Sequence, residues 1–208
     1  MTLTIGHHRV AKRQADQREA EPAIPAVRGP SAIKSAEIRI GRKLTESESR
    51  KILLENGVGE SYVTVRIHLS DINAFYREAG DRSKPTVLLI HGGGNCSSLN
   101  WRYQILALAE HFHVIAPDLV GYGNTREPAG HTATLAYHEN FIAQFMDALG
   151  IKSANLVGNS MGGGISAGVA ANNPKHVDKL FLIAPHNVSY TVQSPFIKTV
   201  SSMLFWLS

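Results

Sequence analysis

The stretch Gly158-Asn159-Ser160-Met161-Gly162-Gly163 decides the fold because of what stands on either side of it. The apolar run at 154–158 predicts a buried strand, and the small residues at 161–171 predict a helix. A serine between them lies on a sharp, strained turn, and the flanking positions come so close to other backbone that only glycine fits. Its hydroxyl then stands clear of the sheet, at the positive end of the following helix. We interpret Ser160 as a nucleophile; the alternative is a Gly/Ser-rich phosphate-binding turn.

A second glycine-rich loop, His91-Gly92-Gly93-Gly94, follows the apolar run at 85–90. A nucleophile that attacks a carbonyl group generates an oxyanion, which needs two backbone N–H donors already aimed at it. The loop supplies one such donor and the residue after the nucleophile, Met161, supplies the other. We interpret the His91 imidazole as a hydrogen-bonded stabiliser of the loop and not as the general base.

Strand and helix patterns alternate along the chain from residue 61 onward. This alternation predicts an α/β fold with a mostly parallel sheet and flanking helices, with two closely joined strands as its antiparallel edge. The strands are expected at 61–68, 72–78, 85–90, 113–116, 154–158 and 179–184. The helices are expected at 46–55, 101–110, 135–149 and 161–171.

The chain divides into four parts by composition. Residues 1–43 are expected to form a disordered or extended arm, because three prolines fall within 21–30. Residues 44–60 form a short helix and linker, since Thr45 and Glu48 have the spacing of a capping box. Residues 61–186 are the α/β core. Residues 187–208 begin a cap, because Ser194-Pro195 signals a helix start and apolar residues follow.

Charge and cysteine content exclude several classes of function. The net charge is only +4 and no run of five like charges occurs, which argues against nucleic-acid binding. A single cysteine, Cys96, excludes an internal disulfide framework and a cysteine-based zinc site. No apolar run reaches the ~18 residues that span a bilayer, and the N-terminus lacks the apolar core of a signal peptide. We therefore expect a cytoplasmic protein that acts on a small-molecule substrate without a cofactor or metal.

With these motifs in order, residues 61–186 resemble the α/β-hydrolase superfamily. The third motif, Ala116-Pro-Asp118-Leu-Val-Gly121-Tyr-Gly123, stands between the glycine loop and the serine turn. Within the superfamily, Gly-Asn-Ser-Met-Gly-Gly, Asn100-Trp101 and the segment 106–121 look like the meta-cleavage-product hydrolases, which cleave a carbon–carbon bond in vinylogous 1,5-diketones.

The resemblance assigns roles to individual residues of this chain. It implies that Ser160 is the nucleophile and that Gly93 and Met161 donate the oxyanion-hole amides. It further implies substrate contacts at Gly92, Asn100 and Asn159.

One departure from the pattern leaves the substrate open. Asn95-Cys96 follows the glycine loop where the family usually has Pro-Gly, so carboxylesterases, lactonases and related hydrolases remain alternatives to carbon–carbon bond hydrolases. Serine at position 160 argues against epoxide hydrolases and haloalkane dehalogenases, which place aspartate there. Asp118 is expected to be structural, and His138 is expected to be a surface or packing residue.

The remaining members of a catalytic triad are not found in the sequence. In the superfamily an acid and then a histidine follow the nucleophile, whereas this chain has only Asp178, His176 and His186 after Ser160. His176 and Asp178 are expected in the turn before the last strand, away from the serine. The chain thus looks like the N-terminal part of a hydrolase. We expect it to be a poor catalyst alone, and to form homo-oligomers or aggregate through the exposed edge at 179–184. The alternative is a non-catalytic hydrolase-like binding module or an inactive fragment.

Overall fold

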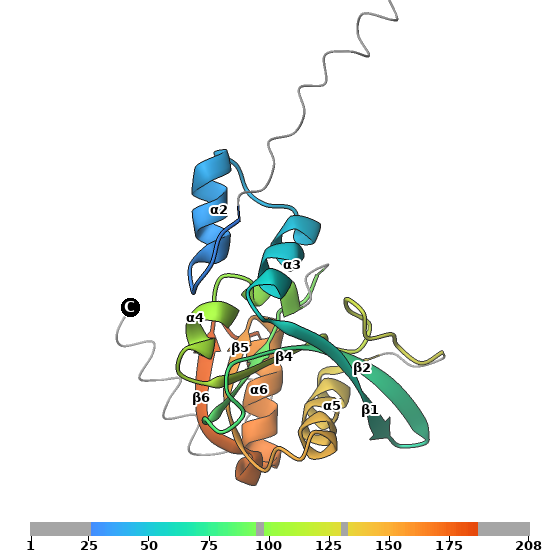
Figure 1. Ribbon diagram of the computed structural model, residues 1–208. Helices are drawn as coiled ribbons and strands as arrows, with labels where there is room; N and C mark the ends of the chain where they lie inside the picture. The colour runs from blue at the N-terminus through green and yellow to red at the C-terminus, as the bar shows by residue number, and fades with distance from the viewer. Residues whose placement is uncertain (1–25, 95–97, 130–132, 187–208) are drawn as a thin grey trace, which may run out of the picture.

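The computed structural model describes residues 26–94, 98–129 and 133–186. Six strands form one sheet in the order β1-β2-β4-β3-β5-β6 (Figure 1). The β1–β2 and β2–β4 pairs are antiparallel, and the other neighbours are parallel. The strands are β1 Gly59–Ile67, β2 Ser70–Ala79, β3 Thr86–Ile90, β4 His113–Pro117, β5 Ala154–Asn159 and β6 Val177–Ile183. The expected α/β fold with an antiparallel edge is confirmed.

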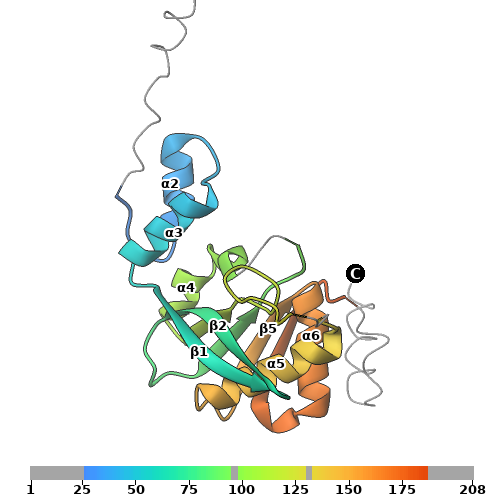
Figure 2. The same cartoon turned by 90° about the vertical axis from the view of Figure 1, so that its right-hand side faces the viewer.

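Helices cover both faces of the sheet. Figure 2 shows α5 and α6 on the side of the sheet away from α4, and both views place α2 and α3 together at one end of the molecule. The helices are α2 Ala32–Ile40, α3 Glu46–Glu55, α4 Ile105–Ala109, α5 Leu135–Ala148 and α6 Met161–Asn172, with 3-10 turns at Ser98–Trp101 and Pro174–His176. The helix expected at 101–110 is thus split into a 3-10 turn and a short α-helix.

The central strand β3 explains why the sheet needs both helical layers. Its side chains alternate between two cores: Leu88 and Ile90 pack with α5 and α6, whereas Val87 and Leu89 pack with α2, α3 and α4. All four are buried, as expected for a parallel strand covered on both faces. For this reason the sequence at 85–90 is continuously apolar and does not alternate between polar and apolar residues.

The N-terminal arm is helical at Ala32–Ile40, so the expectation of a disordered or extended arm is wrong for that part. Helix α2 packs on the core through Ile33 and Ala36. The Asn56 side chain holds the segment before it, accepting a hydrogen bond from Gly29 N and donating one to Val27 O, each at 3.0 Å. The prolines exclude a helix only up to residue 30, and the apolar spacing after them is helical. Residues 1–25 lie outside the described residues.

The short helix expected at 46–55 is confirmed as α3. Thr45 Oγ1 accepts a hydrogen bond from Glu48 N at 3.3 Å, and Thr45 N donates to Glu48 Oε2 at 2.7 Å. These two bonds are the reciprocal capping box that the spacing predicts. Bonding to the Arg42 guanidinium and the Thr45 amide lowers the pKa of Glu48 to about 2.

One further expectation, the cap at 187–208, falls outside the described residues, and so does Cys96. Among the helices of residues 26–94, 98–129 and 133–186, none is long and apolar enough to cross a membrane. The same residues contain no cluster of three or more His, Cys, Asp or Glu that could hold a metal ion.

Candidate active site

Ser160 joins β5 to α6 with backbone angles of φ 52° and ψ −117°. A non-glycine residue in this region is strained by about 1–3 kcal/mol, so the surrounding structure must hold it there. Ser160 N donates to Ile183 O at 2.9 Å, and Ser160 O accepts from His186 N at 2.8 Å and Gly163 N at 3.0 Å. The predicted strand–turn–helix around a strained serine is confirmed.

The two glycines that flank the turn are required by close backbone contacts. A Cβ atom on Gly158 would lie 2.3 Å from Gly162 O, and one on Gly162 would lie 2.2 Å from Ile90 O. Neither distance is tolerated between non-bonded atoms, because the obstructing atoms belong to backbone and cannot rotate away. The Gly-x-Ser-x-Gly spacing is thus a packing requirement between β3, β5 and α6.

Ser160 opens onto a cavity of about 420 Å³. Its described lining combines apolar side chains with a serine and two histidines. The lining residues are Gly93, Ala133, Leu135, His138, Ser160, Met161 and His186. No described residue hydrogen-bonds the Ser160 hydroxyl, so this oxygen is available to a ligand.

Two backbone amides beside Ser160 are also available. Met161 N is the first donor of α6, and no described residue accepts from it or from Gly93 N. The two segments are adjacent, since a Cβ on Gly93 would lie 3.7 Å from Met161 Sδ and 3.8 Å from Tyr122 Oη. The cavity therefore brings a hydroxyl group, two free N–H donors and the end of a helix together.

Of the three predicted substrate-contacting residues, the structure places two beside Ser160 and one outside the described cavity lining. A Cβ on Gly92 would lie 3.2 Å from Ser160 Cβ and 3.7 Å from Asn159 Nδ2, so Gly92 and Asn159 adjoin the serine. Asn100 lies half-buried in the 3-10 turn Ser98–Trp101 and is not among the described residues that line the cavity.

The structural role expected for His91 is confirmed by its hydrogen bonds. Nδ1–H donates to Gly92 O at 2.7 Å, and Nε2 accepts from Leu119 N at 3.0 Å. Burial lowers the pKa of His91, which is in keeping with a neutral ring. With both nitrogens occupied, His91 has none left to take a proton from Ser160.

Asp118 likewise has a structural role, as expected. Its carboxylate is fully buried, accepting from Ser98 N at 2.7 Å through Oδ1 and from Asn124 N at 2.9 Å through Oδ2. It thereby ties together two loops near the carboxyl ends of the strands.

His138 is the cavity residue that the sequence interpretation missed. The expectation of a packing residue is confirmed, since His138 is only 2% exposed. The sequence did not predict that it lines the same cavity as Ser160. Its spacing from Leu135 and Ile142 places it on the inward stripe of α5, and that spacing was the available signal.

The two histidines that follow Ser160 lie in different places. His176 precedes β6, whose first residue pairs with the start of β5, so it lies about 20 Å from Ser160 by the rise of a strand. Its Nε2 is 3.5 Å from Asp147 Oδ1. His186 lines the cavity and its backbone nitrogen bonds Ser160 O.

Comparison with known proteins agrees with this geometry. The alpha/beta hydrolase fold family matches residues 85–208. The chain is 35% identical over 142 residues to the dihydrolipoyllysine-residue acetyltransferase component of the acetoin cleaving system of Cupriavidus necator, covering 66% of this chain and 37% of that protein. It is 36% identical over 108 residues to 2-hydroxymuconate semialdehyde hydrolase of Pseudomonas sp. (strain CF600), covering 51% and 38%.

A solved structure of a hydrolase is also similar to this chain. The meta-cleavage product hydrolase of Pseudomonas fluorescens IP01 superposes with a TM-score of 0.54 at 34% identity, covering 59% of this chain and 43% of that one. The chain thus spans well under half the length of these relatives. Because the family match extends over more than half of its residues, the chain belongs to the alpha/beta hydrolase fold family.

Proposed function

We propose that the protein is a serine hydrolase in which Ser160 attacks the carbonyl carbon of a small substrate. The observation that carries this proposal is the strained backbone of Ser160 at the mouth of a cavity, with its hydroxyl group unbonded among the described residues. Strain of this kind is retained where a side chain must be held for chemistry. A non-catalytic binding module has no use for it, which favours the enzyme over that alternative.

The free backbone amides of Gly93 and Met161 can stabilise the negative charge that this attack creates. As the serine oxygen bonds to the carbonyl carbon, negative charge develops on the carbonyl oxygen, and preorganised N–H donors stabilise that charge. Met161 N also stands at the N-terminus of α6, where the helix dipole favours an anion. We assign these two amides to the oxyanion hole.

Substrate recognition falls to the residues next to the serine. Asn159 and Gly92 adjoin Ser160 and are proposed to contact the substrate. Asn100 does not line the described cavity and is proposed as a substrate contact on the sequence pattern alone. Esters, lactones and vinylogous diketones all present the required carbonyl group. The carbon–carbon bond hydrolases among the relatives support the last of these.

A base must remove the proton of Ser160, and three of the described histidines fit this role poorly. Both nitrogens of His91 are occupied, and His176 is too distant. Burial lowers the pKa of His138 to about 4, which makes it a weak proton acceptor at neutral pH. We therefore expect the 208-residue chain to be acylated slowly, because an unassisted serine is a weak nucleophile.

Acetylation by p-nitrophenyl acetate tests the proposal. The folded chain is incubated with the ester, and the modified residue is located by peptide mass mapping. We expect acetyl-Ser160 to accumulate, and the Ser160→Ala chain to lose that label while keeping slow background labelling of lysines. The His186→Ala chain shows whether the second cavity histidine assists. Equal labelling of all accessible groups, with none favoured at Ser160, contradicts the proposal.

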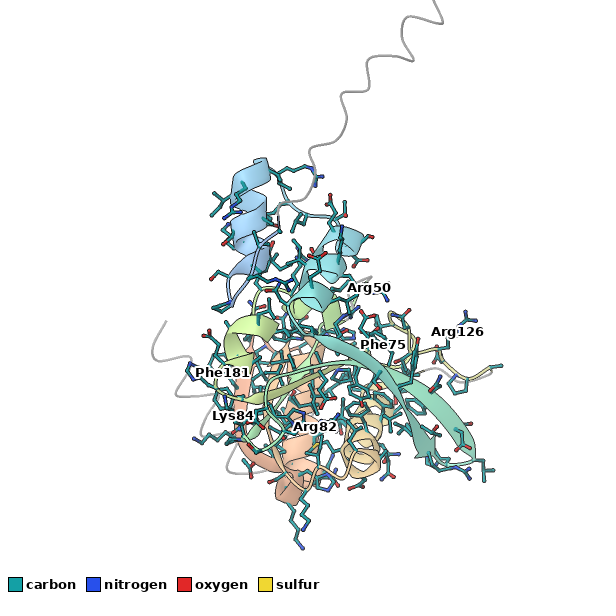
Figure 3. The ribbon with its side chains drawn as sticks, in the orientation of Figure 1. Arg50, Phe75, Arg82, Lys84, Arg126 and Phe181 are labelled. Carbon is teal, nitrogen blue, oxygen red and sulfur yellow. The ribbon has the colours of Figure 1, made fainter. Side chains whose placement is uncertain are left out.

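We further propose that the chain self-associates through β6. This strand has one neighbour in the described sheet, and its Phe181 side chain, labelled in Figure 3, is 63% exposed. Beside it lies an apolar groove of about 890 Å³ that Trp101 and Leu108 also line. An unpaired strand edge next to apolar surface favours pairing with another chain.

Phe181→Lys tests this association. We expect the wild-type chain to elute from a sizing column at a size that increases with concentration, and the variant to remain monomeric over the same range. Tyr62→Lys is the matched control, since Tyr62 is also an exposed aromatic residue but lies on the β1 edge. A wild-type chain that stays monomeric at all concentrations contradicts the proposal.

A further inference from the structure

His138 lies in the first turn of α5 and lines the cavity onto which Ser160 opens. Tyr122 and Tyr137 flank its ring, with each ring centroid 6.3 Å away. The Tyr122 hydroxyl is in turn 3.8 Å from Met161 Sδ. The imidazole is therefore packed against two tyrosine rings, and through Tyr122 it adjoins the start of α6.

The imidazole has no hydrogen-bond partner among the described residues. Its Nδ1 is buried and unbonded, and no described group bonds Nε2 either. Only Nδ1 is sealed from solvent, so Nε2 is the nitrogen that a ligand in the cavity can reach. Because no described residue bonds Nε2, that nitrogen is left to form a hydrogen bond with a ligand that enters the cavity.

The charges around His138 select the kind of group it can bind. Burial and the neighbouring His91 lower the pKa of His138 to about 4, although Glu127 opposes this shift, so the ring is neutral at pH 7. The Glu127 carboxylate accepts a hydrogen bond from Ala133 N at 2.6 Å, and Ala133 lines the cavity. No Lys or Arg is found in the described lining. Next to His138, an anionic group would thus meet the Glu127 charge with no cationic side chain in the described lining to offset it.

A hydroxyl group matches these constraints best. It is uncharged, and it can either donate or accept, so it pairs with whichever tautomer the neutral imidazole adopts. We propose that His138 hydrogen-bonds a hydroxyl group of the substrate, so that the protein prefers carbonyl substrates that carry a hydroxyl near the reacting carbon. This inference rests on the proposed function, since it places the substrate carbonyl at Ser160.

Binding to a chain that cannot react provides the test. Methyl 3-hydroxybutanoate and methyl butanoate are titrated into the Ser160→Ala chain, and the imidazole ¹H–¹⁵N signals are followed by NMR. We expect the hydroxylated ester to bind about three- to tenfold more tightly, as one added hydrogen bond predicts. We also expect it to shift the His138 signals, which the unsubstituted ester leaves nearly unchanged.

Variants at position 138 distinguish a hydrogen bond between His138 and the substrate hydroxyl from a role of His138 in packing alone. In the Ser160→Ala background, His138→Leu is expected to remove the preference, whereas His138→Gln keeps a donor and an acceptor and restores part of it. His176→Gln, which lies outside the cavity, is the control that leaves the preference intact. If His138→Leu fails to fold, the His138 signals and the glutamine variant still decide the outcome.

Three outcomes overturn the inference: equal affinity for the two esters, a preference that survives His138→Leu, or no binding of either ester at its solubility limit. Acetylation of Ser160 in the wild-type chain judges the proposed function separately. A chain that acetylates Ser160 but binds both esters equally therefore refutes the role of His138 alone.

Discussion

Gly162→Ala is expected to destabilise the fold by about 3 kcal/mol or more, at the upper end of what an overpacked interior costs. The added methyl group would lie 2.2 Å from Ile90 O and 2.4 Å from His91 O. Both oxygens belong to the backbone at the end of β3, the central strand, which is paired on both sides. Relief therefore requires α6 to move away from the sheet, and that movement also displaces Ser160.

Urea unfolding, followed through the fluorescence of buried Trp101, measures this loss. The matched control is Gly59→Ala, because Gly59 is also in a regular element and its added methyl group would meet only Glu78 O, at an ordinary 3.7 Å. We expect the control to change stability by less than about 0.5 kcal/mol. Equal unfolding midpoints for the two variants would show that α6 does not approach β3 this closely.

Asp118→Ala is expected to cost about 2–3 kcal/mol, because it leaves the buried Ser98 N–H group and the partly buried Asn124 N–H group without an acceptor. The amides of Ser98 and Asn124 both donate to this carboxylate, and the Ser98 residue is itself fully buried. The substitution also releases two loops near the site, so we expect the loss to be accompanied by faster amide exchange at these positions.

The control for Asp118 is Asp71→Ala, which removes a carboxylate that pairs with Arg66 at the surface. Both partners of that pair are more than half exposed, and exposed ion pairs contribute about 0–1 kcal/mol. The comparison by urea unfolding therefore isolates burial as the cause. An Asp118→Ala chain no less stable than the Asp71→Ala chain would mean that Asp118 is not the tie between the loops.

The serine turn was predictable because all of its signals are local. An apolar run, a Gly-x-Ser-x-Gly spacing and a stretch of small residues lie within some twenty positions, and each part constrains its immediate neighbours. The same holds for α3, where Thr45 and Glu48 are three residues apart and cap the helix through each other. Local chemistry of this kind does not depend on how distant segments pack.

His138 and α2 were not predicted because their environments are made by distant parts of the chain. The cavity around His138 is lined by residues of α5, of the glycine loop and of the start of α6. No short sequence pattern predicts that these three segments lie together. Asn56 holds the segment before α2, and Tyr103, which follows β3 in the chain, donates a hydrogen bond to Glu37 of α2 at 2.8 Å. The prolines before α2 correctly predicted that no helix forms over residues 26–30. The prediction of an extended arm was wrong at Ala32–Ile40, because the packing of these later residues stabilises a helix.

The order of strands in the sheet also bears on how the molecule is built during translation. Strands β1 to β4 can pair as soon as they leave the ribosome, with β3 exposing one free edge. Strands β5 and β6 then join that edge in the order of their synthesis, so the sheet grows in one direction and no completed pair has to open. Because Ser160 N bonds to Ile183 O, the serine turn is fastened only when β6 arrives. The serine turn is thus among the last features of the described chain to form.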